Sequence, residues 1–140
     1  MSFRIFALSI LFILLIFPGR LTAQEITFNV DSLRFGSVEL QDSVNRLFQI
    51  TNTGSEVLSV DSILFAGADA GEFIALSPLD SFILGPVGRR NFNIRFLPQN
   101  IGIKDARLEF YGNQLGPNPA VMPFQAEAIP IPPPDISAGF

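Results

Sequence analysis

Short segments in which apolar and polar residues alternate, separated by turn signals, are the feature that most limits the fold of this chain. The clearest segment is residues 89–96, where Phe92, Ile94 and Phe96 alternate with polar residues, and residues 103–111 repeat the pattern. A period of two places alternate side chains on opposite faces of a β-strand. Beyond the N-terminal segment no window has a sustained helical period, so the chain is predicted to be all-β.

Nine segments with strand character lie between Gly, Pro, Asn and Ser residues. They cover residues 26–30, 32–35, 43–52, 57–65, 72–76, 82–84, 89–96, 103–111 and 120–128. We expect the second segment to stop at Gly36. Pro123 is expected to confine the last segment to a sheet edge, or to a position where the missing amide donor needs no partner. The spacing predicts an immunoglobulin-like antiparallel β-sandwich of seven to eight strands, with Phe side chains between the sheets.

The first 23 residues have the pattern of an export signal. Arg4 precedes an apolar run from Ile5 to Phe17, Pro18 and Gly19 break it, and a small residue, Ala23, ends the segment. This pattern predicts a signal-peptide helix cleaved after Ala23. As a helix the run spans about 20 Å, short of the ~30 Å of a bilayer core, so an uncleaved anchor is the weaker alternative. We therefore expect a secreted, periplasmic or cell-surface protein that contacts the membrane only through the signal.

The composition excludes several classes of function. The chain has no Cys and no His, so disulfides, Cys-ligated zinc and Ser-His-Asp catalysis are absent. Without Arg4 and Arg20, the 9 basic residues fall to 7 against 13 acidic residues, a net charge of −6. An acidic chain is a poor ligand for phosphate backbones, so we expect no nucleic-acid partner. We also expect no cofactor.

The C-terminal segment differs from the rest of the chain. Residues 129–134 read Ile-Pro-Ile-Pro-Pro-Pro, which favours an extended polyproline conformation. The predicted organisation is therefore a signal peptide at 1–23, a sandwich domain at 24–128 and a Pro-rich linker or tail at 129–140. A stiff linker of this kind also predicts that the chain is a fragment or short paralogue of a multi-domain surface protein.

Five motifs in order resemble a known family. They are Leu33–Val38 (Leu-Arg-Phe-Gly-Ser-Val), Phe48–Gly54, Leu58–Val60, Ala66–Phe73 and Ile94–Pro98, the last followed by Gly102 and Ala106. Together they resemble the bacterial Hydin-like and abnormal-spindle-type immunoglobulin-like domains of choice-of-anchor D proteins, which are relatives of the major sperm protein sandwich. The resemblance covers residues 28–128. It departs from the family pattern at Ala126, where the family often has Gly.

The resemblance implies a scaffold and brings no catalytic residues. The structural motif residues that it implies are Phe35, Gly36, Asn52, Gly54, Gly67, Asp69, Phe73, Phe96, Pro98 and Gly102. Gly36 and Gly54 suit positive φ or tight turns, and Asn52 suits an Asx-turn. Pro98 is expected to close a strand at a sheet edge.

Two groups of carboxylates are candidate sites. Asp69 and Glu72, with Asp61 and Asp80 nearby, suggest calcium, but no Asp-x-Asp run or 12-residue ligand loop accompanies them. A separate pair, Asp105 and Glu109, suggests glycoside hydrolysis, but four residues of strand separate them by about 13 Å. We therefore expect no metal site and no catalytic site.

Three residues are candidates for ligand contact. Arg95 and Arg107 face outward on strands expected to pair or to be neighbours, where they suit an acidic partner or glycan, although pairing with Glu109 is the simpler role. Tyr111 suits a sugar, through the loops 67–71 and 111–117. The leading hypothesis is an exported non-enzymatic module that binds other proteins or cell-surface components. Carbohydrate binding or adhesion, and a single-domain periplasmic chaperone, are the alternatives.

Overall fold

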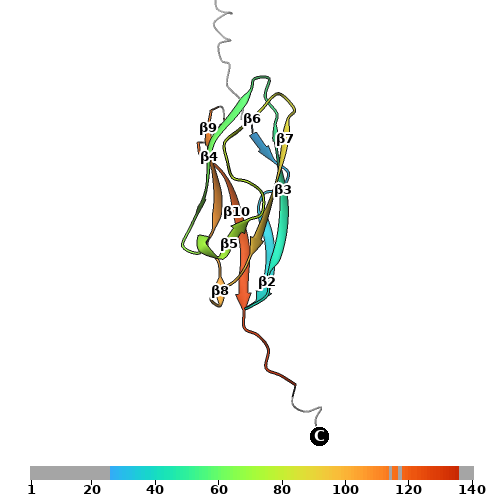
Figure 1. The fold of residues 1–140 in the computed structure, drawn as a ribbon, viewed down its shortest axis with the longest axis vertical. Helices are drawn as coiled ribbons and strands as arrows, with labels where there is room; N and C mark the ends of the chain where they lie inside the picture. The colour runs from blue at the N-terminus through green and yellow to red at the C-terminus, as the bar shows by residue number, and fades with distance from the viewer. Residues whose placement is uncertain (1–25, 114, 117, 136–140) are drawn as a thin grey trace, which may run out of the picture.

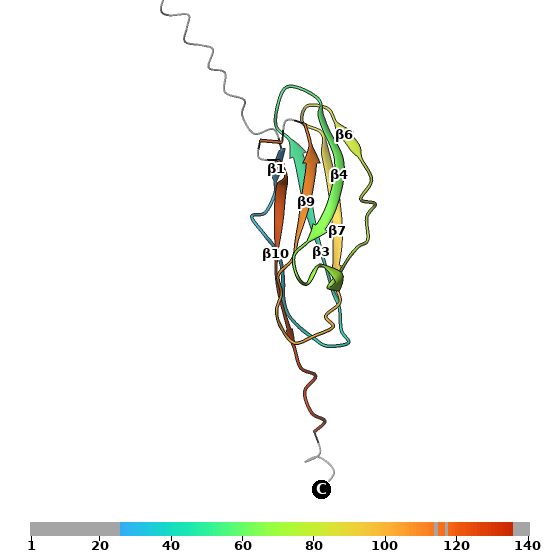
Figure 2. The same cartoon turned by 90° about the vertical axis from the view of Figure 1, so that its left-hand side faces the viewer.

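The computed structural model describes residues 26–113, 115–116 and 118–135. In this part of the protein two β-sheets lie face to face and enclose an apolar core (Figures 1 and 2). The predicted all-β sandwich is therefore confirmed, whereas the signal-peptide helix predicted at residues 1–23 lies outside the described residues. None of the described segments is a helix with the length and apolar character needed to cross a membrane.

Each sheet is built from strands that are distant in sequence. The first sheet has the order β1–β3–β7–β5, formed by β1 (Ile26–Phe28), β3 (Val44–Asn52), β7 (Arg89–Phe96) and β5 (Phe73–Ala75). The second has the order β2–β10–β9–β4–β6, formed by β2 (Leu33–Glu39), β10 (Ala120–Ile129), β9 (Arg107–Gly112), β4 (Leu58–Ala66) and β6 (Phe82–Leu84), with β8 (Gly102–Ile103) beside β10. A short 3-10 helix, η2 (Ala70–Glu72), precedes β5.

The described residues form ten strands, more than the predicted seven to eight. Residues 103–111 were expected to be one strand, but they divide into β8 and β9 around the buried side chain of Lys104. After Ile129 no strand is assigned to residues 130–135, and this segment leads away from the end of the sandwich (Figure 1). Residues 136–140 of the predicted tail lie outside the described residues.

The second strand differs from its prediction in two ways. It continues past Gly36 to Glu39, and it pairs with β10 in parallel, which corrects the expected purely antiparallel sandwich. The register shifts opposite Gln125 and Ala126, so Phe35 is the extra residue of a β-bulge. Gly36 has a φ of +78°, a conformation that suits glycine and lets the strand continue beyond the bulge.

Pro123 lies in an inner strand, because β10 runs between β2 and β9. The N–H of Phe124 donates to Ala106 O (3.0 Å) on the β9 side. Successive backbone nitrogens of a strand point to opposite sides, so the nitrogen of Pro123 faces the side of β2. Pairing with β2 starts only at Phe124 opposite Leu33. The proline therefore costs no ladder hydrogen bond, which is the second of the two predicted placements.

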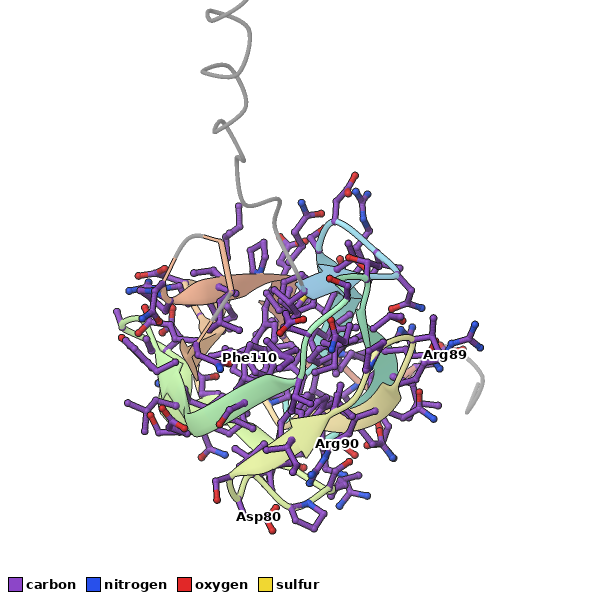
Figure 3. All side chains as sticks on the ribbon, turned by 90° about the horizontal axis from the view of Figure 1, so that it is seen from above. Asp80, Arg89, Arg90 and Phe110 are labelled. Atoms are coloured by element: carbon purple, nitrogen blue, oxygen red, sulfur yellow. The ribbon has the colours of Figure 1, made fainter. Side chains whose placement is uncertain are left out.

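Ten Phe side chains of the described residues fill the space between the sheets, as predicted. Phe110 lies at the centre of this space (Figure 3), and its ring centroid lies 5.5–6.2 Å from those of Phe28, Phe48 and Phe92. The rings form two groups: Phe28, Phe48, Phe82, Phe92 and Phe110 near β1 and β6, and Phe35, Phe65, Phe73, Phe96 and Phe124 near β5. This separation is consistent with the need to fill a long, narrow sandwich with large side chains.

Asn52 holds one end of the sandwich together. Its side chain is fully buried, donates to the carbonyl oxygens of Glu56 (2.8 Å) and Leu84 (2.9 Å), and accepts from the N–H of Gly54 (2.9 Å). The last of these bonds is the predicted Asx-turn. Gly54 is not among the glycines with positive φ, so it serves the tight turn instead.

The other motif residues converge near η2. Phe35, Phe73 and Phe96, which come from three separate motifs, contact one another at centroid distances of 4.8–5.8 Å. Gly67 has a φ of +106°, and a Cβ there would lie 2.5 Å from Asp105 O, so only glycine permits this approach. Pro98 follows the end of β7, which is an inner strand, so the expected sheet-edge position is wrong.

Candidate interaction surface

The carboxylates weighed as a calcium site are bound to separate partners. Asp69 Oδ2 accepts from the N–H of Asp105 (2.7 Å), Asp61 Oδ1 accepts from Ser59 Oγ (3.0 Å), and Asp80 pairs with Arg90 at the edge of the sandwich (Figure 3). Within the described ranges no group of three or more acidic side chains could hold a metal ion. These carboxylates therefore do not converge on a common point in the described part of the chain.

Glu72 instead forms a buried ion pair with Lys104, the one Lys of the chain. Lys104 Nζ lies 3.0 Å from Glu72 Oε2 and also donates to Asn100 O, while Glu72 Oε1 accepts from the N–H of Gln99 (2.6 Å). Both side chains are buried. The pair fastens η2 and the β7–β8 connection to the second sheet. Sequence reasoning missed it because the two residues are 32 positions apart.

The suggested hydrolytic pair is also divided between two environments. Asp105 Oδ2 accepts from the N–H of Ala68 (3.2 Å), beside the close approach of Gly67. Glu109 is bound by Arg107 (Nε to Oε2, 2.8 Å) and by Tyr111 (Oη to Oε1, 2.7 Å) on the outer face of β9. Each carboxylate thus serves a local structural contact.

Arg107, Glu109 and Tyr111 form a row in which each shifts the pKa of the others. The hydrogen bonds from Tyr111 and then Arg107 lower the pKa of Glu109, and the bond to Glu109 raises the pKa of Tyr111. The same carboxylate raises the pKa of Arg107. Because the Tyr111 hydroxyl is already bound, the row is satisfied internally, and the pairing with Glu109 runs along one strand and not across two.

The Tyr111 shift gives a direct prediction. The chain has one Tyr and no Trp, so the ultraviolet absorbance of phenolate reports this residue alone. We expect its pKa in the folded protein to lie above the usual value of ~10 and to fall in Glu109→Ala, with Glu127→Ala as the control that leaves it unchanged. A raised folded pKa stabilises the protein below the unfolded pKa, and this stabilisation is lost as the pH rises through the folded value. Identical titrations of the parent and Glu109→Ala would contradict the assignment.

Two of the expected juxtapositions do not occur. Arg95 lies on β7 in the first sheet and Arg107 on β9 in the second, so the strands are neither paired nor neighbours. Gly67 and Tyr111, the first residues of the two loops proposed to hold a carbohydrate, lie toward opposite ends of β9, because Ala66 faces Arg107 while Tyr111 faces Ser62. A single site that combines these elements is therefore excluded.

One long side of the sandwich is open where β2 and β3 face each other. We call this region, residues 29–34 and 44–48, the β2–β3 seam. β1 pairs with β3 only over residues 50–52. Asn29 then ends this pairing, because its N–H donates to Gln49 O (3.0 Å) and its Oδ1 accepts from Gln49 N–H (2.7 Å). The edge of β3 before Gln49 has no neighbouring strand among the described residues.

Leu47 presents its backbone to this seam. Residues two apart in a strand direct their N–H and C=O groups to the same side, and those of Gln49 face β1. Asn93, which lies opposite Leu47 on β7, uses its carbonyl and N–H for Leu76 and Ser77 on the β5 side. The Leu47 side chain is itself 65% exposed. Its N–H and C=O therefore face the open edge of the sheet, and its apolar side chain is exposed to solvent.

Two arginines, Arg34 and Arg46, lie in the seam, and Arg95 lies beside it, linked to Arg46 through Asn45. Arg95 Nε donates to Asn45 Oδ1 (2.9 Å), Arg46 Nη1 donates to Asn45 O (2.9 Å), and Arg46 Nε donates to Arg34 O (3.0 Å). None of the three forms a salt bridge with a carboxylate of the described residues, whereas three other cations do. In an acidic chain this is a local concentration of unpaired positive charge.

A cleft of about 500 Å³ follows the seam and is lined by Val30, Asp31, Ser32, Arg34, Arg46 and Leu47, among others. Ser32 is 6% exposed, and its Oγ has no hydrogen-bond partner within the described part of the chain. A second cleft of similar volume covers the outer face of β10 and shares Arg34. The sequence did contain a signal for the seam: Arg46 is the polar exception on the otherwise apolar face of its strand.

Comparison with known proteins places the fold. No protein-family model and no curated protein matches the chain. Among solved structures, the ASH/PapD-like domain 7 of human CEP192 superposes with a TM-score of 0.60 at 14% identity, covering 81% of this chain and 91% of that one. A secreted serine protease, VesC of Vibrio cholerae, gives 0.57 at 11% identity, over 74% of this chain and 24% of the protease. SSP-19, an MSP-domain-like protein of Caenorhabditis elegans, gives 0.50 at 16% identity, over 73% and 99%.

These likenesses support a PapD-like or MSP-like immunoglobulin fold. Their identities of 11–16% carry the architecture alone. The function of this chain must therefore be argued from its own surface.

Proposed function

We propose that this chain is an exported, non-enzymatic immunoglobulin-like module that binds another protein or cell-surface component through the β2–β3 seam. The observation that carries the proposal is the seam itself, where an open strand edge, an exposed Leu47 and unpaired arginines meet beside a cleft. Exposed edges are the parts of a sandwich that most readily accept another chain. Membership in the Hydin-like, choice-of-anchor D group and export after cleavage at Ala23 are parts of the same proposal.

The other strands at sheet edges are less suited to bind an added strand than the β2–β3 seam. β1, β5 and β6 are each three residues long, so they offer few main-chain hydrogen bonds to an added strand. The acidic residues weighed as catalytic or calcium-binding are committed to separate local contacts, which supports a binding role over an enzymatic one.

Site-specific photocrosslinking tests the proposal in the source organism. A photoreactive residue at Leu47 is expected to give a discrete adduct with one partner in the compartment to which the protein is exported. Ile83, which is 68% exposed on β6, provides the matched control. Adducts that are equally abundant from both positions, or absent from Leu47, would contradict binding through the seam.

A further inference from the structure

We infer that the β2–β3 seam receives an acidic protein segment in extended conformation, with its carboxylates toward Arg34 and Arg46 and its apolar side chains beside Leu47. This inference rests on the proposed function and names the partner chemistry of the same surface. Three steps lead to it: the charge of the seam, the geometry of its open edge and the size of its cleft.

The charge of the seam favours a carboxylate-bearing partner. Arg34 and Arg46 line the cleft, and Arg95, outside it, is linked to Arg46 through Asn45. The cleft also contains one carboxylate, Asp31, which is exposed at the surface. The guanidinium groups outnumber it, and a guanidinium binds a carboxylate through directed, charge-assisted hydrogen bonds. An acidic segment therefore complements the seam better than a neutral or basic one.

The open edge favours an extended backbone. A strand laid beside β3 meets the outward N–H and C=O of Leu47, at the place where β1 stops pairing. Side chains alternate between the faces of a strand. Arg46 and Leu47 project from opposite faces of β3, and both residues line the cleft, so a neighbouring strand repeats this alternation. The expected pattern is an acidic residue at every second position, separated by apolar residues.

The cleft has room for more than a single ion. Its volume of about 500 Å³ and the apolar groups of Val30, Leu33 and Leu47 suit a peptide segment with side chains. Ser32 Oγ in its wall lacks a hydrogen-bond partner among the described residues. A buried hydroxyl without a partner costs free energy, so a ligand that satisfies it gains affinity.

Synthetic peptides with this pattern provide the probe. We would measure fluorescence anisotropy of labelled (Glu-Val)5, (Gln-Val)5 and (Lys-Val)5 against the full chain without its signal segment. Saturable binding of (Glu-Val)5 is expected, about tenfold or more tighter than that of (Gln-Val)5, with none for (Lys-Val)5. The affinity should fall as NaCl rises from about 0.05 M to about 0.5 M.

Variants locate the binding. Arg34→Glu with Arg46→Glu should abolish it, and Asp31→Asn should strengthen it severalfold because a like charge is removed. Arg89→Glu is the matched control, since Arg89, the first residue of β7, also lacks a salt bridge among the described residues but points away from the sandwich (Figure 3). Circular dichroism melts confirm that each variant is folded.

Three results would overturn the inference. They are equal binding of (Glu-Val)5 and (Gln-Val)5, no binding of (Glu-Val)5, and equal weakening by Arg89→Glu and the seam variants. Each of these results is compatible with a discrete photocrosslinked adduct at Leu47. In that case the seam binds a partner of different chemistry. If Leu47 gives no adduct, the proposed function itself fails.

Discussion

Lys104→Met is expected to lower the free energy of unfolding by roughly 3–5 kcal/mol, because it leaves the buried carboxylate of Glu72 without its cation. The substitution keeps a long apolar side chain in place, so the loss reports the charge and its hydrogen bonds and not a cavity. Urea denaturation followed by circular dichroism measures the change in free energy.

A double variant and an exposed pair serve as controls. Glu72→Gln with Lys104→Met removes both charges and keeps an acceptor for the N–H of Gln99, so most of the stability should return. Asp80→Ala breaks the pair with Arg90, where the Asp80 side chain is 70% exposed, and should cost at most about 1 kcal/mol. If Lys104→Met and Asp80→Ala had equal effects, the buried pair would not have the assigned role.

Phe92→Ala is expected to cost a similar amount, roughly 3–5 kcal/mol, because it opens a cavity in a core without disulfides. The Phe92 ring is fully buried and contacts Phe48, Phe82 and Phe110 at centroid distances of 5.3–6.1 Å. Urea denaturation again gives the measurement, and Leu47→Ala on the exposed face provides the control, with an effect within about 0.5 kcal/mol.

The two Phe groups add a second test to this prediction. Phe96→Ala disturbs the group near β5, and no ring contact between described residues joins it to the group of Phe92. Effects at independent sites add, so the double variant should equal the sum of the single variants to within about 0.5 kcal/mol. A large departure from additivity would show that the core behaves as one unit.

Local pattern predicted much of this fold. The alternation in residues 89–96 and 120–128 placed Phe92, Ile94, Met122 and Phe124 inside, where the structure has them. This succeeded because a strand with one buried face records that burial in its own sequence. The sequence of a strand does not specify which other strand will pair with it. The parallel pairing of β2 with β10 could therefore not be predicted from Leu33–Glu39.

The candidate site depends on contacts between distant segments, which is why its geometry was harder to predict. The sequence pattern predicts ligand contact for Arg95, but its link to the backbone of Arg34 runs through Asn45 and Arg46, from one sheet to the other. Glu72 was noticed as a loop carboxylate, and only the folded chain brings Lys104 to it. The charged residues can be recognised in the sequence, but only the folded structure shows which of them form ion pairs.

Amide hydrogen exchange at Leu47, followed by NMR, tests the open seam most directly. In the free protein we expect the Leu47 amide to exchange fast, while the amide of Phe48, which faces β7 opposite Phe92, is protected. Saturating (Glu-Val)5 should then slow exchange at Leu47 and leave Phe48 unchanged. A Leu47 amide that is already protected in the free protein, or that stays unprotected with bound peptide, would contradict the account of the seam as a binding edge.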